Sequence, residues 1–411
     1  METQTNKEFF DALNGALSDV FNNGMRADKA IGLQLKAHPR LAGYLQGQLA
    51  QTVYAATRWW RPMRSLIRDV DKAGPSRDGD LAYKPADLDG LMAALRFLTI
   101  GEQDAGAWPK GLTPKILRAR WARLQENPAM AHSMPDWLEK ACAAELGADW
   151  EPIARTLLDE PAVYLRVNLQ KTTPAKLAGA LKVLAPEPVP GSRDALVVRH
   201  KGTLFRSPEF IAGHFEVQDL SSQQVAPFLQ AKPGMRVVDV CAGEGGKTLH
   251  LSALLENKGR ILSLDTEEWK LENLRRRCRR AGAFNVEPRL IEGTKTAKRL
   301  ASTADAVLID APCSGLGVLR RHPDIKWKLA EDSLPRLREL QAEILDRNCR
   351  IVKKGGALVY ATCSLLPSEG EAQVQAFVAR HPGLFTLEAE QRISPATGPH
   401  DGFYMARLRR L

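Results

Sequence analysis

The sequence has no cysteine or histidine pattern typical of a structural metal site. Its six cysteines are widely spaced and form no C-x-x-C pair, and its eight histidines show no ligand-like spacing. No stretch approaches the roughly 18 consecutive apolar residues of a membrane span, and the start lacks a basic region followed by an apolar run. These absences argue against a disulfide-stapled, secreted or membrane-embedded protein. We therefore expect a cytoplasmic protein with reduced thiols and no metal.

Repeats and low-complexity segments are also absent, and the remaining composition is that of a globular chain. At 411 residues, with 44% hydrophobic and 26% charged residues, the chain can form two or three domains with ordinary cores. Lysine and arginine number 58 against 48 acidic residues, which gives a formal charge of +10. That excess favours a polyanionic partner such as RNA, although it serves solubility equally well. We expect a monomer.

The hydrophobic periodicity changes twice along the chain, which predicts three domains. Residues 1–145 place apolar residues at three- and four-residue spacing, so we expect an all-helical N-terminal domain that binds RNA. Residues 146–225 predict a small α/β, RNA-recognition-like unit, because strand-like runs at 162–170 and 195–200 flank a helix. Residues 226–411 alternate strands and helices, as an α/β fold with a doubly wound, Rossmann-like sheet requires.

Four short apolar runs and four helix starts define the predicted sheet of the last domain. The expected strands are Arg236–Val240, Arg260–Leu264, Ala306–Ile309 and Ala357–Thr362, and the helices begin near Gly246, Glu267, Asp332 and Ser368. Gly282 is expected to end the second helix and Gly355-Gly356 the third, since glycine is common just beyond a helix. The closing FYMARLRRL predicts a last strand.

A glycine-rich turn follows the first of these strands in VVDVCAGEGGKTLHL, residues 237–251. A dinucleotide-binding G-x-G-x-x-G would need glycine in place of Thr248, and a phosphate-binding G-x-x-x-x-G-K-T would need glycine in place of Cys241. The turn can instead bring its backbone close to a small flat ligand, with Asp265 at the next strand end placed to accept from ribose hydroxyls. This arrangement suits S-adenosylmethionine. A packing turn without a ligand is the alternative.

Two cysteines directly follow buried strands of the same predicted sheet. Asp310 and Cys313 belong to Asp-Ala-Pro-Cys, and Cys363 belongs to VYATCSLLPSEGE. Because the carboxyl ends of parallel strands face one crevice, these side chains should lie near the glycine turn. The cysteines inside helical patterns are interpreted as buried small hydrophobes; they are Cys142, Cys278 and Cys349.

Two thiols and a carboxylate beside a methyl-donor site limit the reaction. Carbon-5 of a pyrimidine is too weak a nucleophile to take a methyl group directly, but a thiolate added to carbon-6 makes it enolate- or enamine-like. A base must then remove the carbon-5 proton before the thiol leaves, and a hydrogen-bond partner at the ring nitrogen assists. The residues therefore point to pyrimidine carbon-5 methylation.

Four motifs together resemble the RNA (cytosine-5)-methyltransferase family of the RsmB/NOP/NSUN type, and above all its bacterial small-subunit rRNA branch, methyltransferase B. They are DAPCSGLGVLRRHPDIKW, ATCSLLPSEGE, VVDVCAGEGGKT and HDGFYMARLRR. The resemblance implies methyl transfer from S-adenosylmethionine to a cytosine in small-subunit (16S) ribosomal RNA through a covalent cysteine adduct. It also implies an antitermination-factor-like helical domain at the N-terminus.

The resemblance assigns roles to individual residues. It makes Cys363 the attacking nucleophile, Cys313 the residue that assists product release, and Asp310 a contact of the base and of the donor's amino group. Lys247 begins a helix and is expected near the substrate. The expected donor-binding residues are Cys241, Ala242, Gly243, Glu244, Gly245, Gly246, Lys247, Asp265, Thr294 and Asp310.

Three positions depart from the family's pattern. The usual Ala-Pro-Gly-Gly is Gly-Glu-Gly-Gly at 243–246, the adenine-contacting Asp is Thr294, and the Asn expected after Glu369 is Gly370. None of them is one of the two cysteines, so the expected reaction is unchanged. Donor affinity is the property they affect, because a threonine bonds more weakly than a carboxylate.

Several other functions stay open. A non-catalytic ribosome-assembly factor on the same fold would bind RNA without needing a donor, and a tRNA cytosine-5 methyltransferase would use the same residues. Cys241 disfavours a nucleoside triphosphatase, and a second thiol in Thr-Cys-Ser disfavours methylation of DNA.

Two groups of basic residues are candidate RNA contacts. The first follows the Cys313 loop and comprises Arg320, Arg321, His322 and Lys326. The second lies beside Trp59 and Trp60 and comprises Arg58, Arg61, Arg64 and Arg68, although core packing is the default role of those tryptophans.

Overall fold

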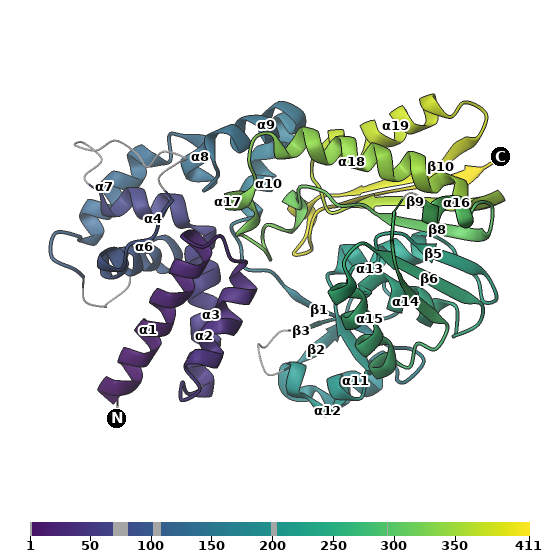
Figure 1. Cartoon of the computed structure of the whole chain (residues 1–411). Coiled ribbons are helices and arrows are strands. Elements are labelled where there is room, and N and C mark those ends of the chain that lie inside the picture. The colour runs from purple at the N-terminus through teal and green to yellow at the C-terminus, as the bar shows by residue number, and fades with distance from the viewer. Residues whose placement is uncertain (1, 69–80, 102–107, 199–203, 294) are drawn as a thin grey trace. The chain divides into compact units, whose positions relative to one another are not determined.

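The computed structural model describes residues 2–68, 81–101, 108–198, 204–293 and 295–411 (Figure 1). They form two compact units. The first runs to Asp159 and includes Leu319–Glu331, and the second comprises Glu160–Val318 and Asp332–Leu411. The chain therefore leaves the second unit after Val318 and returns to it at Asp332. The division into three domains stays a prediction. No helix in these described ranges has both the length and the apolar character to cross a membrane.

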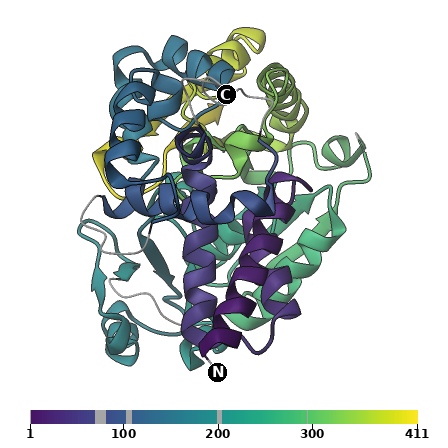
Figure 2. The same ribbon diagram turned by 90° about the vertical axis from the view of Figure 1, so that its left-hand side faces the viewer.

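The first unit is helical throughout its described part. Its helices are α1 (Glu2–Phe21), α2 (Ala27–Ala37), α3 (Gly43–Arg58), α4 (Trp60–Ile67), α6 (Leu88–Ile100), α7 (Pro114–Leu124), α8 (Pro128–Ala131), α9 (Asp136–Leu146), α10 (Trp150–Thr156) and α17 (Ile325–Lys328). Helices α1, α2 and α3 pack side by side (Figures 1 and 2) and bury Leu13, Leu17 and Leu49. Trp60 is fully buried and stacks on Phe21, so core packing is its role.

The arginines beside Trp59 and Trp60 are buried in this unit instead of facing outward. Arg61 donates to the carbonyl of Met134 and pairs with Asp136, while Arg64 donates to a backbone carbonyl of the same unit. Each of these two residues is 2% exposed. Their guanidinium groups therefore donate to acceptors within the protein and not to water. The expected RNA-facing surface is therefore wrong for Arg61 and Arg64, and Arg58 is buried as well.

The segment that follows the Cys313 loop is also part of the helical unit. Lys326 Nζ donates to the carbonyl of Arg58 at 2.9 Å, and the indole of Trp327 donates to the carbonyl of Thr57 at 2.7 Å. Arg320 Nε donates to the carbonyl of Thr156. Arg320 and Lys326 are 3% and 2% exposed, so the prediction that they grip RNA phosphates is wrong. Burial lowers the pKa of Lys326 well below its usual range.

A small antiparallel sheet opens the second unit. Its strands are β1 (Val163–Val167), β2 (Pro186–Pro188), β3 (Ala195–Val198) and β4 (Phe215–Val217), in the order β2-β3-β1-β4. Helices α11 (Pro174–Ala180) and α12 (Pro208–Ile211) accompany it. As the sequence indicates, Thr173 caps α11, because its side chain accepts from the Lys176 amide. The predicted α/β character of this segment is confirmed.

A seven-stranded sheet forms the centre of the second unit (Figure 1), in the order β10-β11-β9-β8-β5-β6-β7. The strands are β5 (Arg236–Asp239), β6 (Arg260–Asp265), β7 (Val286–Leu290), β8 (Ala304–Asp310), β9 (Val352–Thr362), β10 (Phe385–Ile393) and β11 (Phe403–Arg410). The helices are α13 (Leu220–Phe228), α14 (Gly246–Leu254), α15 (Glu268–Ala281), α16 (Lys295–Arg299), α18 (Ser333–Asn348) and α19 (Glu371–Arg380). The four predicted strands and the doubly wound α/β class are confirmed.

The order of the strands determines where a ligand can bind. Strand β5 pairs in parallel with β6 on one side and with β8 on the other, so the chain order reverses at β5. In sheets of this kind, ligands bind beyond the carboxyl ends of the strands at such a reversal. Asp239 ends β5 and Asp310 ends β8, which places two carboxylates there.

The prediction that Gly355-Gly356 ends a helix is wrong. Helix α18 ends at Asn348, and both glycines lie inside β9. The pairing of β9 with β8 shifts register between Ala304 and Ala306, opposite these glycines, and Gly355 has a φ of +74°. A β-carbon at Gly356 would lie 2.9 Å from the carbonyl oxygen of Asp305. The pair therefore forms a β-bulge, where glycine is as favoured as it is beyond a helix.

Candidate active site

The two predicted cysteines meet at neighbouring strand ends. Cys313 follows β8 and Cys363 follows β9, and these strands run parallel with Asp310 opposite Ala361. The two Sγ atoms lie 3.4 Å apart, and both residues are partly buried. The pKa of Cys313 lies well above its usual range, first because its thiol is hydrogen-bonded to Cys363 and then because it is buried. Either sulfur can be the donor in this contact.

Close backbone contacts join the two cysteine loops. The Gly317 amide donates to the carbonyl of Cys363 at 2.9 Å, and the Gly402 amide donates to the carbonyl of Gly317 at 2.8 Å. A β-carbon at Gly317 would lie 2.2 Å from the Gly402 oxygen and 2.8 Å from the Cys363 oxygen. Only glycine fits without moving the backbone that carries Cys363.

Gly317→Ala should therefore destabilise the second unit and displace Cys363. We expect the free energy of unfolding to fall by about 1–3 kcal/mol, the usual cost of overpacking. Urea unfolding measures this change. The matched control is Gly179→Ala in α11, where a β-carbon meets nothing within 4 Å, so that this substitution should be neutral or stabilising. Equal stability of the two variants would contradict the tight contact at Gly317.

Lys247 and Asp310 form an ion pair at the end of β8, the strand that precedes Cys313. Lys247, in the first turn of α14, places Nζ 2.6 Å from Asp310 Oδ2, and the two side chains are 12% and 27% exposed. The same ammonium lies 5.0 Å from the ring centre of Phe403, the first residue of β11. The structure thus brings two predicted site residues together and adds an aromatic face that was not predicted from the sequence.

The glycine turn between β5 and α14 is held by the end of β6. Asp265 accepts from the Gly243 amide at 2.9 Å and from the Glu267 amide at 3.0 Å. Gly243 and Gly245 have φ values of +55° and +86°, and a β-carbon at Gly245 would lie 2.1 Å from Leu274. The turn needs glycine at both positions for its conformation, and at Gly245 for space as well.

Glu244, the acidic residue in this glycine turn, is held through its backbone carbonyl. The carbonyl of Glu244 accepts from Arg277 at 2.8 Å, and Arg277 is paired with the buried Glu216 of β4. The family's proline stiffens this position through its ring, whereas here an anchored arginine holds the backbone. The departure at Glu244 therefore does not leave the turn unsupported.

A cavity of about 300 Å³ opens beyond β5 and β6. Cys241 and Asp265 line it, together with Glu267, Lys270 and Pro312. Thr294 lies outside the described residues, although its neighbours Gly293 and Thr296 also line this cavity.

A buried carboxylate lies directly behind the glycine turn. Asp239 is 1% exposed, and its Oδ2 accepts from Thr248 at 2.6 Å. Its Oδ1 has no hydrogen-bond partner among the described residues. Burial raises the pKa of Asp239 to about 7, with the charges of Asp310 and Asp265 adding and Thr248 and Lys247 opposing. The site thus holds a buried carboxyl group whose pKa lies near neutral pH.

The departure at Gly370 has a structural cause. A β-carbon there would lie 2.8 Å from the Arg392 guanidinium and 2.9 Å from the Tyr404 ring. Arg392 also pairs with Glu371 and donates to the carbonyl of Leu365. These side chains fill the space that the family's asparagine would need.

Several polar residues around the cysteines were not predicted as functional. They are Ser314, Ser364, Gln341 and Glu369, and all four are buried. One signal was available in the sequence, since each cysteine is followed by a serine, as Pro-Cys-Ser and as Thr-Cys-Ser. The position of Glu369 could not be predicted from such local patterns.

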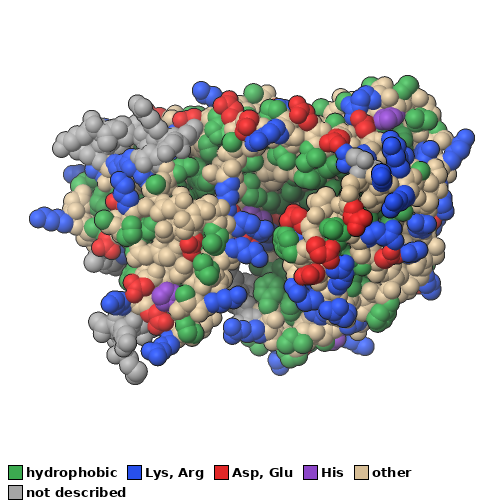
Figure 3. All heavy atoms as spheres, viewed as in Figure 1, with side chains coloured by type: hydrophobic (Ala, Val, Ile, Leu, Met, Phe, Trp, Pro, Cys, Tyr) green, Lys and Arg blue, Asp and Glu red, His purple; other side chains and the backbone are tan. Residues whose placement is uncertain are grey.

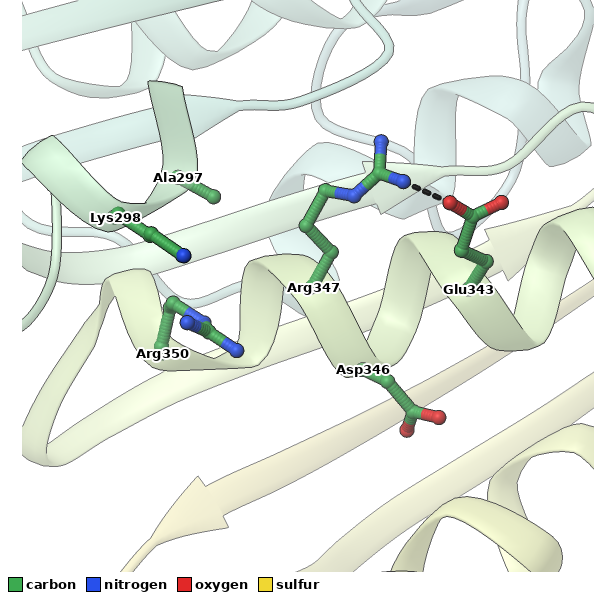
Figure 4. A pocket seen from close by; sticks show the side chains of 6 residues that line it. All are labelled: Ala297, Lys298, Glu343, Asp346, Arg347 and Arg350. Atoms are coloured by element: carbon green, nitrogen blue, oxygen red, sulfur yellow. Dashed lines mark hydrogen bonds and ion pairs between the residues drawn. The ribbon is translucent and has the colours of Figure 1, made fainter. Parts of the chain in front are cut away.

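A second cavity of about 320 Å³ lies between α16 and α18 (Figure 4). Arg347 points toward Glu343 across its mouth and pairs with it, and Asp346 pairs with Arg380 and His381. We assign this cavity no ligand. In the described ranges, no three His, Cys, Asp or Glu side chains are grouped so that they could hold a metal ion.

Comparison with known proteins identifies the family of this site. Residues 226–409 match the model of the 16S rRNA methyltransferase RsmB/F, and residues 134–203 match the ferredoxin-like domain of RsmF/B-like methyltransferases. The ribosomal RNA small subunit methyltransferase B of Pseudomonas putida is 34% identical over 88% of this chain and 89% of its own. The enzyme of the same name from Pseudomonas syringae pv. tomato is 33% identical over 88% of each chain. A crystal structure of a methyltransferase homologue from Pyrococcus horikoshii is 25% identical with a TM-score of 0.62, over 71% of this chain and 99% of its own.

Proposed function

Because this chain belongs to the RsmB/F family of 16S rRNA methyltransferases, we propose that it methylates carbon-5 of a cytosine in small-subunit ribosomal RNA through a covalent bond to Cys363. The methyl donor is S-adenosylmethionine. The observation that carries the proposal is the 3.4 Å contact between the thiols of Cys363 and Cys313 at adjacent strand ends. Direct transfer to a nucleophilic oxygen or nitrogen would need neither thiol, whereas carbon-5 needs one thiol to attack and a second group to assist release.

The crevice at the strand reversal fits the donor. S-adenosylmethionine supplies an electrophilic methyl group on a positively charged sulfur. Asp239 offers a buried oxygen that has no hydrogen-bond partner in the described part of the chain, and Asp265 ends the strand that borders the cavity of about 300 Å³. We assign donor binding to residues 241–247 together with Asp265 and Asp310, with Thr294 as a predicted contact. Lys247 balances part of this negative charge through its pair with Asp310.

The protein's own groups then have distinct tasks. The Cys363 thiolate adds to carbon-6 of the cytosine, and carbon-5 takes the methyl group. A general base then takes the carbon-5 proton, the electrons of that bond form the double bond between carbon-5 and carbon-6, and Cys363 leaves carbon-6 as a thiolate. Cys313 assists the release of Cys363, and Asp310 holds the cytosine ring by hydrogen bonding.

The basic surface of the second unit supports an RNA substrate. Lys and Arg side chains are numerous over this unit on the right-hand side of the view in Figure 3. The formal charge of +10 for the whole chain agrees with a polyanionic substrate.

Nucleoside analysis tests the proposed reaction. The protein is incubated with radiolabelled S-adenosylmethionine and either small-subunit rRNA, assembled small subunits or tRNA, and the digested RNA is analysed for methylated nucleosides. We expect 5-methylcytidine in the rRNA samples. Labelled tRNA alone would support the tRNA enzyme, and a methylated nucleoside other than 5-methylcytidine would contradict the chemistry. If calorimetry shows no donor binding, the assembly factor is the better account.

Donor affinity should increase with pH. Asp239 holds a proton up to a pKa of about 7, because burial and the charges of Asp310 and Asp265 outweigh Thr248 and Lys247. A cationic donor binds best to the ionised form, so its affinity should rise about tenfold between pH 6 and pH 8, as proton linkage requires. Calorimetry at several pH values measures this change.

The variant Asp239→Asn is the control for this pH effect. It should bind the donor more weakly and lose the pH dependence. Without the donor, the protein should lose stability as pH rises from the ordinary pKa of an aspartate to about 7. Over that range Asp239 ionises freely only in the unfolded chain. Asp239→Asn should therefore be more stable than the wild type at pH 8. A pH profile unchanged by Asp239→Asn would remove Asp239 from the effect.

A further inference from the structure

Glu369 is the most completely enclosed carboxylate near the two thiols. It lies in the turn between β9 and α19 and is 0% exposed. Its Oε1 accepts from the Ser314 amide and from Gln341 Nε2, each at 2.9 Å. Its Oε2 accepts from the hydroxyls of Ser314 and Ser364, each at 2.5 Å. The four bonds satisfy the carboxylate entirely from within the protein.

These bonds connect the two cysteine loops to each other. Ser314 directly follows Cys313 and Ser364 directly follows Cys363, and the two hydroxyls also lie 3.2 Å apart. One carboxylate therefore touches the residue after each thiol. Loss of Glu369 would leave each serine without its shared acceptor.

Further contacts extend this connection to the surrounding elements. Gln341 of α18 donates from Nε2 to the carbonyl of Pro312, the residue before Cys313, as well as to Glu369. The carbonyl of Glu369 accepts from the hydroxyl of Tyr360 at 2.9 Å and from that of Thr362 at 3.3 Å. Glu369 thus contacts both loops, the end of β9 and, through Gln341, helix α18.

A buried carboxylate is costly, which makes its position informative. Hydrogen bonds to a charged group are stronger than those between neutral groups, while an unsatisfied buried charge is strongly destabilising. A stable core alone would be served as well by apolar side chains of similar volume. The donors here are instead the residues next to the two thiols, so the network fixes the distance between those loops.

We propose that Glu369 is a positioning residue for the methylation reaction, and that it holds the Cys313 and Cys363 loops together so that the two thiols stay in contact. The inference rests on the proposed function of those thiols. Glu369 acts through the serines and reaches neither the substrate nor the donor. Its charge also adds to the raised pKa of Cys313, after the hydrogen bond to Cys363 and burial.

The test is Glu369→Gln, with Glu343→Gln as matched control. Glu343 lies two residues from Gln341 on α18, pairs with Arg347 and is largely exposed. In Glu369→Gln we expect kcat to fall by about 10²-fold, the loss associated with a misplacement of roughly 1 Å, with donor affinity unchanged. The control should retain kcat.

A second measurement reports on the thiols without any substrate. Diamide oxidises nearby thiols to a disulfide, and peptide mapping gives the rate at which the Cys313–Cys363 bond forms. The rate should fall in Glu369→Gln and stay at the wild-type value in Glu343→Gln. A general loss of structure would instead lower the melting temperature and the donor affinity together, and that result would overturn the positioning role.

Two smaller changes cover the case in which Glu369→Gln does not fold. Ser314→Ala and Ser364→Ala each remove one hydroxyl bond to Glu369 while leaving the carboxylate with three donors. Each should reduce kcat and the diamide rate by less than Glu369→Gln, and their effects should not add, because they share one acceptor. Wild-type values in both would overturn the proposal. A wild-type protein that makes no 5-methylcytidine would contradict the proposed function alone, since the diamide rates still test the connection between the loops.

Discussion

Replacing Cys363 with alanine is expected to abolish methyl transfer while leaving the donor bound. Without the thiolate, carbon-5 of the cytosine has no means of becoming nucleophilic, and no other cysteine follows β9. The rate should fall by about four orders of magnitude or more, the scale of loss when a hydrolase loses its nucleophile. Transfer of labelled methyl groups to small-subunit rRNA measures this rate. Calorimetry should show donor affinity close to that of the wild type.

The control is a cysteine of the same unit that lies outside the site. Cys278 is buried on α15 within a small apolar cluster, so Cys278→Ala should change stability slightly and leave the rate near the wild-type value. Adduct formation is a second measure, because only proteins with Cys363 should form a complex with RNA that survives denaturing electrophoresis. Wild-type methylation by Cys363→Ala would refute the covalent mechanism.

The position of these cysteines could be predicted because it depends on local patterns. Short apolar runs that end at Asp310 and Thr362 indicate buried parallel strands, and such strands end at a shared edge. Two cysteines just beyond two strand ends must then lie in one crevice. The separation of 3.4 Å between the two Sγ atoms follows from the pairing of β8 with β9, which local sequence patterns do not reveal.

The misplaced basic residues show where such reasoning fails. A run containing Arg320 and Lys326 beside a catalytic loop has the composition of an RNA contact. In the structure these groups donate to carbonyls of Thr156 and Arg58, far away in the sequence, and the donors are buried. A run of basic residues indicates an exposed surface only when its side chains have no backbone carbonyl to donate to. Tertiary packing determines whether such a carbonyl is available.

The residues that differ from the family's pattern show a second limit of prediction from the sequence. Taken alone, Glu244 and Gly370 indicate a weakened donor site. Their neighbours change this conclusion, since Arg277 holds the backbone at Glu244, and Arg392 and Tyr404 occupy the space beside Gly370. Compensation of this kind involves residues far apart in the chain, so it becomes apparent only in the folded structure.

Replacing Cys313 with alanine is expected to stop the reaction after methyl transfer and not before it. Cys363 keeps its thiol in this variant, so the attack on carbon-6 and the transfer to carbon-5 can proceed. Release then lacks the group that lies 3.4 Å from the attacking sulfur. Covalent protein–RNA complex should therefore accumulate, with methylated product limited to about one equivalent per protein, as for a covalent intermediate that cannot break down.

Denaturing electrophoresis with labelled RNA separates this outcome from a simple loss of activity. Cys313→Ala should give a slowly migrating band that contains both protein and RNA, whereas Cys363→Ala should give none. The double variant should also give none, because the adduct requires Cys363. Glu369→Gln should lie between these extremes, since both thiols remain but are held less closely. Normal turnover by Cys313→Ala, without a band, would remove Cys313 from the release step.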